Sequence, residues 1–161
     1  MPPTNPIIQL LRGVELFQGL PPIVITEIAR RAMPVAYRPG ERLVHTGDRV
    51  DGSVLIRSGQ AVCSRGDGAV SGEVLAPGSL IHEMGMFVEM ESGATIIART
   101  KVTALALSRQ MMLSFLEEEP RCCDHFNMKI SARVASIAAE LRKIDQSLAL
   151  HSSDPLALRI R

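Results

Sequence analysis

The hydrophobic pattern near the N-terminus predicts two short helices. Apolar residues recur at helical spacing between Ile8 and Phe17, and Gly19 with the Pro21–Pro22 pair ends that first element. Because proline is well tolerated in the first turn of a helix, a second helix is expected from about Pro22 to Ala32. Both helices would precede a stretch with a different pattern.

Between Met33 and Leu107 short apolar runs alternate with glycines, and ten of the twelve glycines of the chain fall in this stretch. Short strands with closely spaced turn signals predict a mainly β sandwich, roll or barrel. Gly40 and Gly47 lie where strands would reverse and where a positive φ is often needed. The expected strands are Val35–Tyr37, Arg42–His45, Ser53–Ser58, Ala61–Ser64, Val70–Leu75, Ala94–Arg99 and Val102–Leu107.

The last third of the chain is predicted to be helical. Ser108 is a good N-cap for a helix over Arg109–Glu118, and Pro120 opens a longer helix from about Arg121 to Ala149. The sequence therefore divides into a β domain with its helices (1–119), a long helix (120–149) and a flexible tail (150–161).

Apolar residues of the long helix step by four and three, which is the seam of a coiled coil sustained for nearly three heptads. The stripe would also suit packing on the chain's own strands, but a narrow alternating seam favours a partner helix. We therefore predict a homodimer, with an interface formed by Phe126, Ile130, Val134, Ile137, Leu141, Ile144 and Leu148.

Composition suits a globular protein with an ordinary core. Of the 161 residues 46% are hydrophobic and 22% are charged, and the mean hydropathy is +0.15. Cys63 and the adjacent pair Cys122–Cys123 do not form a disulfide framework and indicate reduced thiols. No apolar run approaches a membrane span and the N-terminus lacks a basic cluster, so we expect a cytoplasmic protein with no membrane partner.

Charge and motifs exclude two classes of function. With a net charge of +1, four Phe, one Tyr and no Trp, the chain offers neither a basic face nor a base-stacking surface. About a dozen residues follow the heptads, too few for a helix-turn-helix, so we expect no direct DNA binding. His82–Glu83 begins like a zinc-protease helix, but its second histidine is missing and no other catalytic motif occurs, so we expect no enzymatic activity.

Five short motifs occur in a fixed order along the first two-thirds of the chain. They are LFQGLP (16–21), YRPGERLV (37–44), the Gly47–Asp48 turn with Asp51, VLIRSGQAV (54–62) and LAPG (75–78). Together, residues 16–119 resemble the cyclic-nucleotide-binding domain of catabolite-activator-type regulators, kinase regulatory subunits and gated channels. The resemblance implies a mainly β fold with flanking helices, a β-roll of the jelly-roll (double-stranded β-helix) type, followed by a long dimerisation helix. It also implies a sensor domain.

In that family the ligand lies in a phosphate-binding cassette of the form F-G-E-[LIV]-A-L-x(n)-P-R-[SA]-A-T. Residues 81–95 of this chain, IHEMGMFVEMESGAT, are similar to it. The resemblance implies that a glutamate bonds the ribose hydroxyl and that a short helix N-terminus with one arginine holds the phosphate. It assigns ligand binding to Glu83, Met84, Gly85, Ser92, Gly93, Ala94 and Thr95.

Two departures from the family pattern affect this site. His82 replaces the glycine before the glutamate, and Ser92 replaces the phosphate-binding arginine. Losing such a charge-assisted pair costs about 2–5 kcal/mol, and Glu89 and Glu91 would repel a phosphate further. Cyclic AMP or cyclic GMP binding is therefore expected to be weak or lost. His82 is expected either to fill the vacated space or to contact a ligand.

Other cations do not obviously restore the phosphate site, since Arg57, Arg65 and Arg99 are interpreted as solvated charges at strand edges. We expect a small ligand to enter the roll. It would change how the helix over Arg109–Glu118, the hinge helix, packs against the long helix. Two alternatives stay open. One is a ligand-free interaction and dimerisation module with a downstream protein partner. The other is a haem or redox sensor using His82 or His125, the latter beside Cys122–Cys123.

Overall fold

The protein is described by a computed structural model that covers residues 5–64 and 72–152. It divides into two compact units, residues 1–122 and residues 123–161. The first unit begins with α1 (Pro6–Gly13), a short 3-10 turn η1 (Glu15–Phe17) and α2 (Pro22–Arg31). Both predicted helices are confirmed, but the first ends at Gly13 because Val14 has an extended backbone (φ −81°, ψ 125°).

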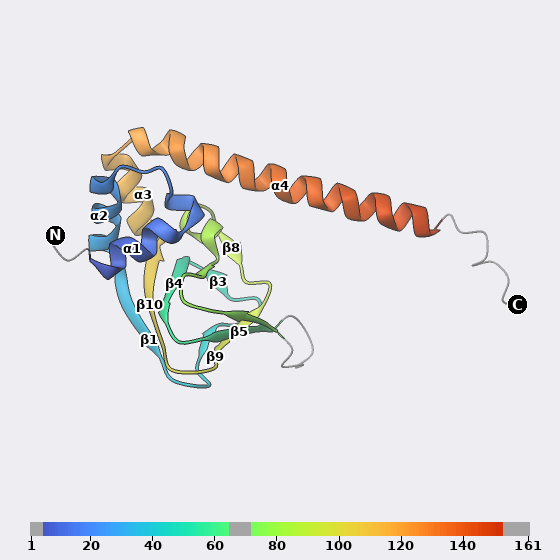
Figure 1. Ribbon diagram of the computed structural model, residues 1–161, viewed down its shortest axis with the longest axis horizontal. Helices are drawn as coiled ribbons and strands as arrows, with labels where there is room; N and C mark the ends of the chain where they lie inside the picture. Colours follow the sequence, from blue (N-terminus) through green and yellow to red (C-terminus); the bar gives the residue numbers. More distant parts are fainter. Residues whose placement is uncertain (1–4, 65–71, 153–161) are drawn as a thin grey trace, which may run out of the picture. The chain divides into compact units, whose positions relative to one another are not determined.

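The strands of the first unit form two four-stranded antiparallel sheets and one two-stranded sheet. The sheet orders are β1-β10-β4-β7, β2-β9-β5-β6 and β3-β8. The strands are β1 (Met33–Tyr37), β2 (Arg42–Val44), β3 (Arg49–Val50), β4 (Gly52–Ser58), β5 (Ala61–Ser64), β6 (Glu73–Leu75), β7 (Leu80–Ile81), β8 (Met90–Glu91), β9 (Thr95–Ala98) and β10 (Val102–Ser108). This arrangement is the jelly-roll β fold that the sequence predicts (Figure 1).

All seven predicted strands occur; six keep their ends to within two residues, and the strand expected at 70–75 begins at Glu73. The first residues of the strand expected at 70–75, residues 70 and 71, lie outside the described part of the chain. Three strands were not predicted, and each is only two residues long: β3, β7 and β8. Two residues are too few to show the alternation by which a strand is recognised in a sequence.

Alternation along β10 gives the first unit two buried layers. Val102 and Ala104 belong to the core between the sheets, where they pack with Ile56 of β4 and Ala98 of β9. The next residue along, Leu105, lies on the opposite face and is also buried, at 1% exposed. The helices α1, α2 and α3 (Arg109–Glu118) lie together at one end of β1 and β10 (Figure 1), and α3 contacts both β10 and β4.

Both predicted C-terminal helices are confirmed. The hydroxyl of Ser108 accepts a hydrogen bond of 3.1 Å from the amide of Met111, which caps α3 as expected. The second unit is formed by the long helix α4 (Arg121–Ser152), which begins one residue after Pro120. On this helix Phe126 is buried and Ile130 is half-buried. The five later positions of the apolar stripe are exposed by 50–63%: Val134, Ile137, Leu141, Ile144 and Leu148.

The glycines of the roll meet two different requirements. Gly40 and Gly47 have φ of +86° and +87° and open space around them, so backbone conformation explains them, as predicted. Gly85 lies in the short helix η2 (Glu83–Met86), where an added Cβ would stand 2.6 Å from the carbonyl oxygen of Gly52. A Cβ at Gly52 would stand 2.3 Å from the carbonyl oxygen of Leu107. The backbones of η2, β4 and β10 are therefore stacked in close contact.

We predict that Gly85→Ala lowers the free energy of unfolding by about 1–3 kcal/mol, because the new methyl group overlaps backbone atoms that have no room to move. The matched control is Gly93→Ala, in an open position outside the stack, which should change the free energy by less than about 0.5 kcal/mol. Urea unfolding followed by circular dichroism measures both. Equal stabilities of the two variants would contradict the close contact.

Candidate functional site

The predicted cassette forms a continuous segment at one edge of the roll. It runs from β7 through His82 into η2, then through β8 to the beginning of β9. Among residues 5–64 and 72–152, His82 is the one non-glycine residue with a positive φ (φ 57°, ψ 51°). This left-handed conformation costs about 1–2 kcal/mol for a residue with a Cβ. The backbone at this position is thus of the kind that favours glycine, although the side chain is an imidazole.

A hydrogen bond joins the two residues that depart from the family pattern. The Nε2 atom of His82 lies 2.8 Å from the Oγ atom of Ser92, and Ser92 is only 2% exposed. The Ser92 hydroxyl donates its single proton to the carbonyl oxygen of Ala94 at 2.7 Å. Nε2 of His82 must therefore carry a proton and donate to Ser92 Oγ. The position at which the family has a cationic arginine thus holds a buried hydroxyl that is satisfied within the protein.

Burial also removes positive charge from this place, because desolvation lowers the pKa of His82 below its usual 6.5. The imidazole is therefore neutral at pH 7. Within the cassette, residues 81–95, no Lys or Arg replaces the missing charge, and Glu89 and Glu91 remain. An anionic phosphate would meet neutral donors and negative side chains here.

The end of the cassette is fixed to the turn between β2 and β3. The amide of Ser92 donates to the carbonyl oxygen of Asp48 at 2.9 Å, and the amide of Gly47 donates to that of Ser92 at 2.8 Å. The hydroxyl of Thr95 accepts from the amide of Thr46 at 3.1 Å. The carboxylate of Asp48 accepts at 2.9 Å from the amide of His45 and so stabilises the turn.

The structure places the seven predicted ligand-binding residues in two groups. Glu83, Met84 and Gly85 lie in η2, the first two half-buried and the third buried. Ser92, Gly93, Ala94 and Thr95 form the return segment into β9, with Gly93 exposed and Ala94 buried. The His82–Ser92 hydrogen bond connects the two groups. Their role in ligand binding stays a prediction.

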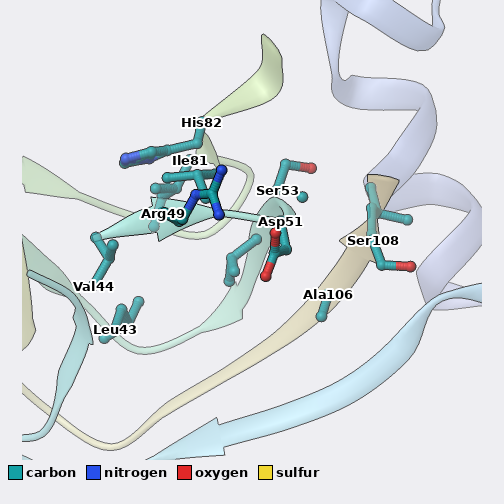
Figure 2. A pocket seen from close by; sticks show the side chains of 13 residues that line it. Leu43, Val44, Arg49, Asp51, Ser53, Ile81, His82, Ala106 and Ser108 are labelled. Atoms are coloured by element: carbon teal, nitrogen blue, oxygen red, sulfur yellow. The ribbon is translucent and has the colours of Figure 1, made fainter. Parts of the chain in front are cut away.

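A cavity of about 280 Å³ lies inside this end of the roll (Figure 2). Of the predicted site residues, His82 alone lines it. The remaining lining residues come from β2, β3, β4, β7 and the end of β10, and most are aliphatic. They are Leu43, Val44, Arg49, Val50, Asp51, Gly52, Ser53, Val54, Ile81, Ala106, Leu107 and Ser108.

Arg49 lines the cavity and was missed by the sequence analysis. It lies in β3, one of the strands too short to be predicted, so nothing in its neighbourhood indicated which way its side chain points. In Figure 2 its side chain lies between those of His82 and Asp51. Arg57 and Arg99, which were considered instead, are exposed and do not line the cavity. Arg65 lies outside the described residues.

Arg109, also missed by the sequence analysis, ties the first turn of α3 to the cassette. Its guanidinium donates hydrogen bonds of 3.0 Å to the carbonyl oxygens of Val50 and Val88, the second just after η2. Its amide donates to the carbonyl oxygen of Asp51 at 2.7 Å, and its guanidinium lies 3.4 Å from the Asp51 carboxylate. No sequence motif indicates Arg109, because the backbone oxygens to which it donates come close to it only in the folded chain.

The other end of α3 is held by a second arginine. Arg31 of α2 forms an ion pair with Glu118 in the last turn of α3, and a further ion pair of 2.7 Å with Glu27 of its own helix. Its guanidinium carbon also lies 5.7 Å from the ring centre of Phe115, within the range of a cation–π contact. The helix α3 is thus connected to the cassette at its beginning and to α2 at its end.

Metal ligation and membrane insertion are two further possibilities for the described residues. In the parts of the chain that the structure describes, no three or more His, Cys, Asp and Glu side chains are grouped so as to hold a metal ion. No described helix combines the length and the apolar character that crossing a membrane requires.

Comparison with known proteins gives a consistent result. The family model of the cyclic nucleotide-binding domain matches residues 34–119. A cAMP-dependent protein kinase regulatory subunit of Colletotrichum orbiculare is 30% identical over 99 residues, which are 62% of this chain and a quarter (25%) of that protein. The chain therefore corresponds to only a part of that relative's length.

Solved structures are similar over more of the chain. The N-terminal domain of a transcriptional regulator from Streptomyces coelicolor A3(2) has a TM-score of 0.72 at 25% identity, covering 80% of this chain and 94% of that one. The catabolite activator protein of Thermus thermophilus has a TM-score of 0.62 at 27% identity, covering 85% of this chain and 62% of that one.

The lowered pKa of His82 predicts a pH dependence of stability. Below about pH 6.5 the unfolded chain binds a proton at this residue more readily than the folded chain, so the free energy of unfolding should fall as the pH falls. His82→Asn, which tolerates the left-handed backbone, should reduce this decline. The control His45→Asn, at an exposed histidine, should retain it. Urea unfolding at pH 7 and pH 5 tests this, and an identical decline in wild type and His82→Asn would contradict it.

Proposed function

Because the chain belongs to the cyclic nucleotide-binding domain family, we propose that it is the sensor domain of a regulator and has no catalytic role. Its output is a rearrangement of helices. The observation that carries this proposal is the direct connection between the cassette and α3. The stacked backbones of Gly85, Gly52 and Leu107 and the hydrogen bonds of Arg109 form this connection.

The proposed signal passes from the roll to the hinge helix. A ligand that moves η2 or β3 displaces carbonyl oxygens to which Arg109 donates, so α3 must adjust at its first turn. The contacts of Arg31 hold the other end of α3, which favours rotation of this helix over simple translation. Because Pro120 alone lies between Glu119 and the start of α4, the adjustment is passed on to the long helix. Such a change requires a ligand with different affinities for the two packings.

The ligand is proposed not to be an ordinary cyclic nucleotide. The His82–Ser92 hydrogen bond satisfies the hydroxyl that stands at the arginine position, and the neutral imidazole adds no charge. The same bond also favours the alternative of a dimerisation module that has lost its ligand. The cavity beside His82 supports the sensor, since a domain without a ligand has no need of space at this place.

The homodimer is supported by the apolar stripe on α4. Its last five positions are exposed by 50–63% in the single chain, although a helix in water normally turns such side chains inward. Their spacing of three and four residues is that of a two-stranded seam. We therefore limit the proposed interface to these five residues and Ile130, since Phe126 is buried in the single chain.

Restoring the family residues at both departures tests the proposal on the cassette. We predict that His82→Gly/Ser92→Arg tightens cyclic AMP binding by about two to three decades over wild type, because it restores the cation and removes the left-handed imidazole. The control His82→Gly/Ser92→Gln has a side chain of similar length without the charge and should gain little. Isothermal titration calorimetry with cyclic AMP and cyclic GMP measures all three proteins.

The titration of the wild-type protein tests whether the cassette binds cyclic nucleotides, even if a variant fails to fold. A sub-micromolar dissociation constant of the wild-type protein for either nucleotide would overturn the proposal that the cassette has lost them.

The dimer is tested by charges on the stripe. We predict that Ile137→Glu/Leu141→Glu converts a dimer into a monomer, because like charges would face each other across the seam. The control Ala139→Glu/Gln146→Glu adds the same charge to another face of α4 and should stay dimeric. Light scattering gives the mass, and near-ultraviolet circular dichroism should report an unchanged roll. A wild-type mass of 17.5 kDa at high micromolar concentration would contradict the dimer.

A further inference from the structure

The cavity beside His82 has an aliphatic interior. Leu43, Val44, Val54 and Ile81 line it, and all four belong to or pack against the core between the sheets. Ala106, which faces Val54 across the β4–β10 pair, contributes only a methyl group and so leaves room. Sites of this kind bind the apolar body of a small molecule and leave its orientation to a few polar groups.

The charged groups of the cavity lie on β3 and the residue after it, whereas its neutral polar side chains are His82, Ser53 of β4 and Ser108 at the end of β10. Arg49 is the one cationic side chain among the 13 lining residues. Its ion pair with Glu89 is long, at 3.6 Å, and the two side chains are 80% and 76% exposed, so the pair contributes little. The nearby carboxylate of Asp51 lies 3.4 Å from the Arg109 guanidinium, which offsets its charge. Arg49 can therefore exchange Glu89 for an anionic group of a ligand at small cost.

We infer that this cavity binds a compact monocarboxylic acid, with its aliphatic chain inside the roll and its carboxylate on Arg49. This inference rests on the proposed sensor function and names the ligand class that the sensor detects. The volume of about 280 Å³ is at the small end of ligand pockets, which range over about 300–1,000 Å³. The single cationic side chain of the cavity, Arg49, matches a ligand that carries a single carboxylate. The neutral imidazole of His82 adds a polar wall without a second charge.

The ligand class also explains why the cavity and the cassette differ in character. A cyclic nucleotide presents a ring phosphate, a ribose hydroxyl and a polar base, whereas Leu43, Val44, Val54 and Ala106 offer no donor from their side chains. A single carboxylate on a short hydrocarbon chain needs only the donors of Arg49. The residues that were lost from the phosphate site are therefore not required by this ligand.

Isothermal titration calorimetry with octanoate, octanol and octylamine, each on the full chain, tests the inference. Octanoate should bind most tightly, octanol more weakly and octylamine weakest, because the chain is the same and only the head group differs. Arg49→Gln should weaken octanoate binding about three- to tenfold and leave octanol unchanged, as expected for a partly exposed ion pair. The control Arg57→Gln, an exposed arginine of β4 outside the cavity, should bind octanoate like wild type.

A second variant tests the position of the chain. Ala106→Leu fills the cavity and should abolish binding of both octanoate and octanol, and the smaller change Ala106→Val should weaken both if the leucine variant does not fold. Three results would overturn the inference: no binding of octanoate, octanol binding as tight as octanoate binding, or octanoate binding that is unchanged in either Arg49→Gln or the Ala106 variants.

These outcomes are separate from those of the proposed function. A sensor whose ligand is of another class would fail with octanoate but would still gain cyclic AMP binding in the restored cassette and still dimerise through α4. The opposite result is that octanoate binds normally, the restored cassette gains no cyclic AMP binding and the chain does not dimerise. That result would support the carboxylate site and overturn the proposed sensor function.

Discussion

The rest of the structure depends on the close approach of three backbones, those of η2, β4 and β10. Gly85 and Gly52 allow this approach, because a Cβ at either would stand 2.6 Å or less from a carbonyl oxygen. The contact places the cassette helix directly on the strands that carry the core. It also sets η2 beside the end of β10, from which α3 begins after Ser108. The site and the helix that would carry its signal are therefore parts of one rigid packing.

One hydrogen bond joins the two cassette residues that depart from the family pattern. A serine at the arginine position would leave a buried hydroxyl, and a histidine at the glycine position imposes a left-handed backbone that costs about 1–2 kcal/mol. The Ser92 hydroxyl donates to the carbonyl oxygen of Ala94 and accepts from Nε2 of His82, which gives the imidazole a fixed place. The pair thus preserves the backbone path of the cassette without its charge.

Much of the fold was predictable from the sequence, and the residues that escaped share a physical reason. Alternation identified the seven longer strands, and glycine at positive φ explained the turns at Gly40 and Gly47. By contrast, Arg109 acts through backbone oxygens 21 and 59 residues away, and Arg49 lies in a strand too short to show a pattern. A heptad repeat likewise identifies an apolar stripe, but it does not show whether the stripe packs on its own chain or on a partner chain. Phe126, predicted as an interface residue, is buried in the single chain.

The hydrogen bonds that fix the cassette to the turn before β3 and those that join Arg109 to the roll have different partners. Ser92 is bound to the turn at Gly47–Asp48, whereas Arg109 is bound to Val50 and to Val88, so the two connections meet different parts of the cassette. Val50 also lines the cavity, next to Arg49 on the same short strand. A ligand in the cavity would therefore act on β3, one residue from a carbonyl oxygen that α3 holds. In the proposed mechanism the coupling to α3 therefore does not pass through the phosphate site, and a ligand of different chemistry could use it.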